Sequence, residues 1–201
     1  MYQIEANYTG VTIMMHDRYF ELLSNEGPAP KKKKTPSAED IAADCKLKLH
    51  CDKKGVFVPA DNIRMMLIGN QIRPGAAKIL GSYIEKQKGT EYEQMCKSSI
   101  WILGPKDPLK VYIDPARKTY DEIDERPFVT KNGKGSASRK ITRRPLINLP
   151  WSLSFIIQVT DDQIHESKVR ELMDVAGLRC GCCAYGPTFG RCIISHWKVS
   201  E

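Results

Sequence analysis

The chain has 201 residues, of which 41% are hydrophobic and 27% charged, which indicates a folded globular protein rather than a disordered chain. This length allows one well-buried domain over residues 1–201. The formal net charge of +7 and the pI near 9.0 favour a polyanionic partner, because each Lys or Arg placed on a phosphate releases a condensed counterion. Nucleic acid is therefore the leading class of ligand, and a merely basic protein without such a partner is the alternative.

Neither a membrane span nor a secretory signal is expected. The longest apolar runs, such as Leu153–Val159, are far shorter than the roughly 20 residues that cross a bilayer. The first residues lack a basic region followed by an apolar block and a cleavage site. We therefore expect a cytoplasmic protein, in a prokaryotic cell or an infected host cell, with no membrane partner. Seven cysteines in this setting favour free thiols or a metal over disulfides.

The N-terminal third begins with a predicted strand over residues 3–14, interrupted by the turn-forming Asn7 and Gly10. Residues 25–37 contain three prolines and four consecutive lysines, which indicates a solvated Lys/Pro-rich loop. Ser37 is then expected to cap an amphipathic helix, with acidic residues in its first turn where the helix dipole favours them.

The middle of the chain mixes short strands and helices. Residues 55–72 predict a strand that leads into a helix, with Asp61 as the expected cap. A second short helix is expected over residues 75–87. Residues 99–113 contain two β-branched and aromatic runs joined by a turn, which favours a β-hairpin.

The next stretch is the most asymmetric in charge. Residues 126–144 contain no acidic side chain and seven cationic ones: Arg126, Lys131, Lys134, Arg139, Lys140, Arg143 and Arg144. An Asn-Gly dipeptide inside this run is typical of a tight hairpin turn. We predict a protruding basic hairpin over residues 126–145 that binds phosphates, with a solvated loop of repelling charges as the alternative. The acidic residues around Asp121–Asp124 are interpreted as charge balance for this hairpin.

The C-terminal third predicts a half-buried strand over residues 151–159, an amphipathic helix over 161–177 that ends at Gly177, and a final strand over 191–199. The final strand is expected to place Cys192, Ile194 and His196 on one face and Ile193, Ser195, Trp197 and Val199 on the other. With the preceding elements, this order predicts an α+β, ferredoxin-like (RRM-like) domain: an antiparallel sheet with helices on one side and a protruding basic hairpin.

The stretch 177–192 contains four glycines, four cysteines and two arginines. Glycine lets backbone amides approach a phosphodiester, arginine supplies charge, and aromatic rings stack on unpaired bases. The expected nucleic-acid contacts here are Arg179, Gly181, Tyr185, Gly186, Phe189, Gly190 and Arg191.

A metal is the alternative use of the same stretch. Cys180, Cys182, Cys192 and His196 could converge on one ion, but they lack the two C-x2-C knuckles of tetrahedral zinc sites. We interpret these cysteines as small apolar fillers, and we expect no cofactor.

The pattern G-x-R-x-G at Gly177–Gly181, then G-P-x-F-G-R at Gly186–Arg191, follows a helix and opens a strand. It resembles the C-terminal signature of the RAMP superfamily of CRISPR-associated RNA-binding proteins. The segment Val56–Arg73 resembles the strand-to-helix motif of the same superfamily, and this resemblance adds Arg64 to the candidate nucleic-acid contacts. The basic hairpin falls where backbone subunits of CRISPR effector complexes carry a mobile thumb. The cysteines around Gly181 and the short chain depart from that pattern and leave open a solitary or virus-encoded relative rather than a standard effector subunit.

We therefore expect non-catalytic binding of single-stranded nucleic acid, RNA more than DNA, along the strand or within a CRISPR-type ribonucleoprotein. The expected protein partners are further copies of the chain or effector subunits. One alternative is an endoribonuclease, because processing enzymes of this superfamily use a histidine near the N-terminal helix and some backbone subunits use an aspartate in an N-terminal loop. His16 and Asp17 are the matching candidates here. The other alternative is a viral interaction protein that interferes with a CRISPR complex.

Overall fold

The computed structural model describes residues 1–18, 37–70, 73–85, 88–131 and 137–200, and it leaves the side chains of 128–140 undescribed. The strands are β1 (Tyr2–Gly10), β2 (Met14–Met15), β3 (Phe57–Pro59), β4 (Ile100–Leu103), β5 (Lys110–Asp114), β6 (Glu122–Lys131), β7 (Ala137–Ile147), β8 (Ser152–Val159) and β9 (Cys192–Ser200). The helices are α1 (Ala38–Lys48), α2 (Ala60–Ile68), α3 (Ala76–Ile79), α4 (Gly89–Ser99) and α5 (Glu166–Val175), with π-helical turns η1 (Leu80–Ile84) and η2 (Ala176–Cys180).

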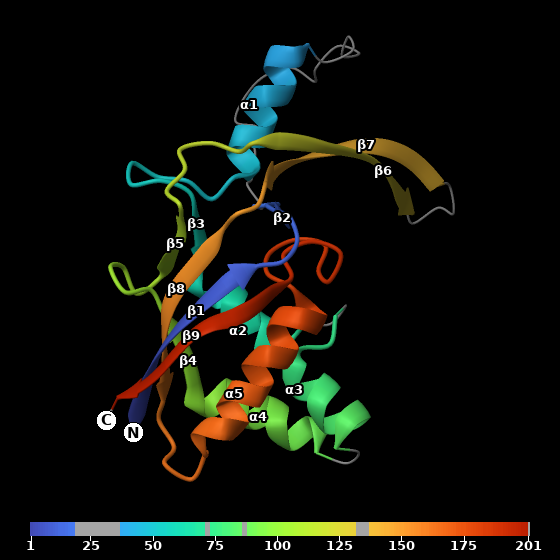
Figure 1. The fold of residues 1–201 in the computed structure, drawn as a ribbon. Coiled ribbons are helices and arrows are strands. Elements are labelled where there is room, and N and C mark those ends of the chain that lie inside the picture. Colours follow the sequence, from blue (N-terminus) through green and yellow to red (C-terminus); the bar gives the residue numbers. More distant parts are fainter. Residues whose placement is uncertain (19–36, 71–72, 86–87, 132–136, 201) are drawn as a thin grey trace, which may run out of the picture.

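The main sheet has the order β3-β5-β8-β1-β9, with β4 also paired to β8, and every described pairing in it is antiparallel. Helices α2 to α5 pack on one side of this sheet (Figure 1). The predicted α+β, ferredoxin-like fold is therefore confirmed. Among the described residues, no helix has the length and apolar character needed to cross a bilayer.

The core lies between the sheet and these helices. Alternate residues of β8, from Leu153 to Val159, are buried as the sequence pattern predicted. They pair in register with β1, where Tyr8 lies opposite Leu153. Tyr8 is fully buried, and its hydroxyl donates a hydrogen bond of 2.6 Å to the carbonyl oxygen of Met173. That bond satisfies the polar tip of the ring and joins the central strand to α5.

The prediction of a β-hairpin over residues 99–113 is wrong. Strands β4 and β5 run along the same edge of β8: Ile102 pairs with Ile157, and Ile113 pairs with Leu153. The two strands pair with β8 instead of with each other, and their alternate residues are buried in the core. Strand propensity identifies such segments but does not choose their partner, which tertiary burial decides.

Three helix boundaries bear on the predictions. Ser37 caps α1, and its side chain accepts a hydrogen bond from the Asp40 amide, as predicted. Asp61 is not the cap of α2, because that helix already starts after Pro59. The last helix does not stop at Gly177 but continues through η2 to Cys180. Helix α4 was not predicted, since its sequence carries few apolar residues.

The predicted face alternation of β9 holds from Cys192 to Ile194 and is wrong beyond Ile194. The pairing shifts between Asn7 opposite His196 and Tyr8 opposite Ile194, so a β-bulge absorbs one residue. The bulge brings Trp197, as well as Ile194, into contact with the core.

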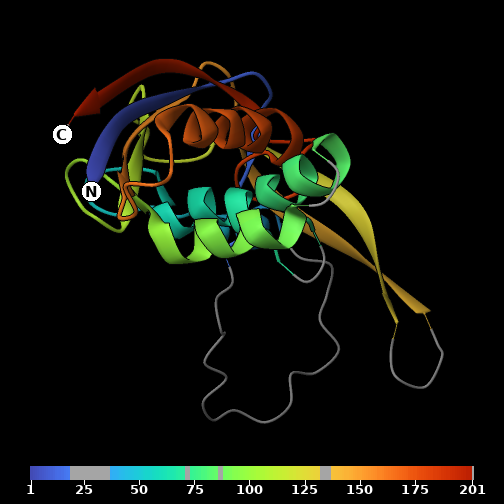
Figure 2. The ribbon, with the colours of Figure 1, turned by 90° about the horizontal axis from the view of Figure 1, so that it is seen from below.

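A second sheet, β2-β7-β6, contains a long hairpin that pairs from Glu122 opposite Leu146 to Lys131 opposite Ala137. The hairpin extends away from the body formed by the main sheet and its helices, as the view from below shows (Figure 2). Helix α1 packs at its base, where the Lys48 ammonium donates to the Arg143 carbonyl oxygen at 2.9 Å. The predicted Lys/Pro-rich loop lies outside the described residues, apart from Ser37.

Candidate nucleic-acid interface

The glycine-rich loop, residues 181–191, connects η2 to β9 and folds back on itself. Gly181 and Gly190 have φ values of +73° and +72°. The Cys182 amide donates to the Gly190 carbonyl oxygen, and the Gly190 amide donates to that of Ile13, both at 2.8 Å. A Cβ on Gly190 would lie 2.0 Å from the Cys182 carbonyl oxygen. These glycines therefore serve the fold of the loop itself, which is a different reason from the expected approach to a phosphodiester.

The loop is also tied to β2. The Ala184 amide donates to the Met15 carbonyl oxygen at 2.9 Å. Gly186 packs against the end of η2, where a Cβ would lie 1.9 Å from the Cys180 carbonyl oxygen. These contacts fix the backbone on both sides of Tyr185.

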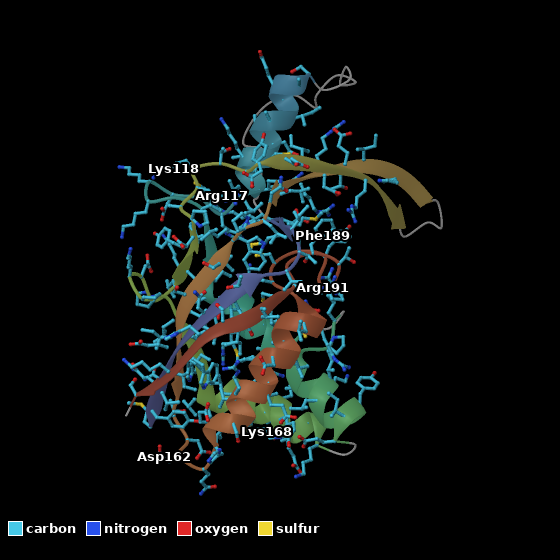
Figure 3. The ribbon with its side chains drawn as sticks, viewed as in Figure 1. Arg117, Lys118, Asp162, Lys168, Phe189 and Arg191 are labelled. Carbon is cyan, nitrogen blue, oxygen red and sulfur yellow. The ribbon has the colours of Figure 1, made fainter. Side chains whose placement is uncertain are left out.

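Two aromatic side chains of this loop meet arginines from the hairpin. The Tyr185 ring centroid lies 4.7 Å from the Arg144 guanidinium carbon and 5.2 Å from that of Arg126. Arg126 also lies 5.1 Å from the centroid of Phe189, which Figure 3 labels on the loop. Arg73, from the segment before α3, reaches Tyr185 at 5.8 Å. We call these five residues the cation–aromatic cluster, and their spacing is within the range of cation–π contacts.

The arginines at the base of the hairpin are paired with acidic residues outside the acid-free run. Arg126 pairs with Asp124, Arg143 with Glu125 and Arg144 with Asp17, each at 2.6 Å. The interpretation of Asp124 as charge balance agrees with this geometry. Arg126 and Arg144 are thereby held beside the aromatic rings. The predicted contacts Lys131, Lys134, Arg139 and Lys140 lie outside the described residues or side chains.

Other arginines around the loop lack such a partner. Within the described part of the chain, Arg73, Arg179 and Arg191 form no ion pair with an acidic side chain. Arg191 is exposed at the end of the loop (Figure 3). These guanidinium groups are available to an anionic ligand.

Arg64 lies elsewhere. Its Nε donates to the Ile100 carbonyl oxygen at 3.1 Å, and its Nη2 donates to that of Lys97 at 2.7 Å. The guanidinium carbon lies 4.0 Å from the Trp101 ring centroid. Arg64 therefore ties α2 to the junction of α4 and β4, and the structure does not bring it to the glycine-rich loop.

A cleft of about 420 Å³ opens beside the cluster. Its wall combines four parts of the chain: the segment after β2 with His16 and Asp17, His50 after α1, the region from α2 to α3, and the turn and loop from Arg179 to Pro187. The sequence alone does not place His16 and Arg179 in one cavity, because residues so far apart in the chain carry no local signal of contact.

The two histidines of this wall are electrostatically unusual. His16 is fully buried, and burial together with the nearby His50 ring lowers its pKa to about 3. Burial and the neighbouring Arg18 lower the pKa of His50 to about 4. The ring centroids lie 5.8 Å apart. Both imidazoles are therefore neutral at physiological pH.

The structure does not join His16 and Asp17 into a dyad. Among the described residues, neither ring nitrogen of His16 has a hydrogen-bond partner. The Asp17 carboxylate instead accepts from Nε of Arg144 at 2.6 Å. A general base that orients through a neighbouring carboxylate is thus not assembled from this pair.

The four candidate metal ligands are not brought together. Cys182 and Cys192 are buried, and burial is the largest cause that raises the pKa of the Cys192 thiol. Burial also raises the pKa of Cys180 to about 11. His196 is exposed on β9, opposite Asn7. In the part of the chain that the structure describes, no group of three or more His, Cys, Asp or Glu is arranged to hold a metal, and all seven cysteines are free thiols.

No family model matches this sequence, and no curated protein matches it either. Among solved structures, the fold is similar to that of a chain described as "Cryo-EM structure of the Type III-B Cmr-beta bound to cognate target RNA", with a TM-score of 0.54 and 12% identity. The match covers 100% of this chain and 61% of that one, so this chain spans about three fifths of its neighbour's length. At this identity the likeness shows a shared fold.

Proposed function

We propose that this protein is a RAMP-like protein that binds single-stranded RNA across the glycine-rich loop and the base of the β6–β7 hairpin. The observation that carries the proposal is the cation–aromatic cluster. It presents Tyr185 and Phe189, two rings on which bases can stack, beside arginines from a separate element. The net charge of +7 and the fold shared with a chain of an RNA-bound complex support the same conclusion.

Two kinds of arginine surround the glycine-rich loop, one inside the cation–aromatic cluster and one outside it. Arg126 and Arg144 hold their guanidinium groups beside the rings through ion pairs, so they reinforce stacking. Arg179 and Arg191 have no acidic partner among the described residues and take the phosphates. Base–aromatic stacking contributes about 1–3 kcal/mol per base and tolerates any sequence, which suits a protein that follows a strand.

The same proposal includes assembly along RNA, alone or within a CRISPR-type ribonucleoprotein, without cleavage. The projecting hairpin supports it, because a strand bound at its base leaves the rest of the hairpin free to reach a neighbouring subunit. The ribonuclease alternative has the weaker support, since His16 is fully buried and Asp17 is paired with Arg144. No observation here favours the viral interaction protein over RNA binding.

The first test removes one ring of the cluster. Tyr185→Asn suits this site because Tyr185 has a φ of +55°, a conformation that asparagine accepts. Fluorescence anisotropy with a single-stranded RNA of about 20 nucleotides should show affinity reduced by roughly 5- to 100-fold, the loss expected for one stacked base.

Tyr83→Asn is the matched control, because Tyr83 is an exposed tyrosine on η1. This variant should bind RNA like the wild type. Equal affinity of Tyr185→Asn and wild type, with both folded, would remove the cluster from the interface.

A further inference from the structure

The cleft beside the cluster has the features of a ligand site that strand binding alone does not require. Its volume of about 420 Å³ lies within the usual range for small-molecule sites, about 300–1,000 Å³. Arg73 and Arg179 line it without an acidic partner among the described residues. An anionic group that enters the cleft therefore meets two guanidinium groups.

Another part of the cleft wall carries two uncharged polar side chains, the neutral imidazoles of His16 and His50. His16 is fully buried, and no described residue satisfies either of its ring nitrogens. Its ring centroid lies 5.8 Å from that of His50, which is half-buried and also lines the cleft. The neutral His50 imidazole offers one donor and one acceptor to a ligand in the cleft. This pattern matches an uncharged polar group, such as the edge of a nucleobase, better than it matches a phosphate.

The cleft also adjoins the proposed stacking surface. Ala184 and Gly186, the chain neighbours of Tyr185, both line it. Arg73 lines the cleft and reaches the Tyr185 ring as well. A nucleotide next to one stacked on Tyr185 is therefore within reach of the cleft.

We propose that the cleft receives one nucleotide of the bound strand, with its phosphate against Arg73 and Arg179 and its base against His50. This inference rests on the proposed RNA binding and adds base preference at one position, where stacking alone is tolerant of sequence. A site built to hydrogen-bond a polar edge discriminates strongly against a ligand that lacks it.

The test titrates the full chain with the four ribonucleoside 5′-monophosphates, and with ribose 5-phosphate as the probe that lacks a base, by calorimetry. At least one monophosphate should bind at least about tenfold more tightly than ribose 5-phosphate. His50→Ala should abolish that preference, and Arg179→Ala should weaken both ligands. His196→Ala, an exposed histidine on β9, is the control and should bind like the wild type. Asn62→Ala, at another residue of the cleft wall, repeats the test if His50→Ala does not fold.

The inference would be overturned if the protein bound all four monophosphates and ribose 5-phosphate with equal affinity. It would also be overturned if His50→Ala kept the full preference for a monophosphate over ribose 5-phosphate. The same samples are titrated with an RNA of about 20 nucleotides. RNA bound without a mononucleotide preference overturns the cleft alone and leaves the proposed function in place. Absence of RNA binding overturns the proposed function itself.

Discussion

At the scale of single residues, burial explains the unusual chemistry of the cleft. His16 lies at full burial with both ring nitrogens unpartnered among the described residues, whereas Asp17, the next residue, is taken by Arg144. These adjacent residues have different roles because the His16 side chain is buried in the core and the Asp17 side chain is exposed. A histidine held neutral in this way is better suited to hydrogen bonding than to acid catalysis at neutral pH.

The lowered pKa of His16 makes a prediction about stability. Its pKa is near 6.5 in the unfolded chain and about 3 in the folded protein, so below pH 6.5 only the unfolded chain takes up this proton. The stability that neutral His16 permits is therefore present above about pH 6.5 and is lost as the pH falls towards 3. This residue should lower the free energy of unfolding by about 2 kcal/mol between about pH 6.5 and about pH 5.

Urea unfolding at both pH values measures this effect. His16→Phe keeps a ring of similar size but cannot take up this proton. Between the two pH values its free energy of unfolding should therefore fall by about 2 kcal/mol less than that of the wild type. His196→Phe replaces an exposed histidine and should retain the wild-type dependence. An identical acid dependence of His16→Phe and wild type would mean that His16 is already charged, or exposed, in the folded protein.

At the scale of elements, the hairpin and the glycine-rich loop contribute different charges to one surface. The described arginines at the hairpin base are paired with Asp124, Glu125 and Asp17, while Arg73 and Arg179 at the cleft are not paired with an acid among the described residues. Neutralising a phosphate with an already paired arginine requires that pair to loosen. The cleft side should therefore account for more counterion release than the hairpin base.

The salt dependence of RNA binding tests this division. The double variant Arg73→Ala, Arg179→Ala should reduce the slope of log K against log salt by about 1.4, at about 0.7 per phosphate on a single strand. Arg143→Ala, which removes an arginine paired with Glu125, is the comparison and should change the slope less. A larger change for Arg143→Ala would place the main phosphate path on the hairpin.

Local elements could be predicted from the sequence where one short segment contains the whole signal. Ser37 and Asp40 form a capping box within a single turn, and the alternation of β8 marks its buried face without reference to other strands. The partner of β4, the bulge in β9 and the extension of α5 through η2 depend on contacts with distant segments, so the sequence pattern left them open or misassigned them.

The candidate site divides in the same way. Tyr185 and Phe189 could be proposed as stacking residues from their place among glycines and arginines. Their arginine neighbours on the hairpin could not be assigned to them, because the loop and hairpin meet only in the folded chain. Arg64 shows the converse: a motif resemblance assigned it to RNA, while the fold uses it to bind the Lys97 and Ile100 carbonyl oxygens.

At the scale of the whole molecule, the ferredoxin-like body carries the β6–β7 hairpin and the glycine-rich loop on the same side. The hairpin projects from the body, and the glycine-rich loop lies beside its base (Figures 1 and 2). The cation–aromatic cluster and the cleft therefore lie side by side, built from the N-terminal, middle and C-terminal parts of the chain.

The most direct measurement of RNA binding along a strand is the mass of the complex as a function of RNA length. Protein mixed with single-stranded RNAs of about 10 to 60 nucleotides is measured by light scattering, and the same samples are run on a denaturing gel. We predict a mass that rises in steps with length and RNA that stays intact. A mass that no RNA changes, or one fixed at one or two subunits while the RNA is cleaved in a manner that His16→Ala abolishes, would contradict this account.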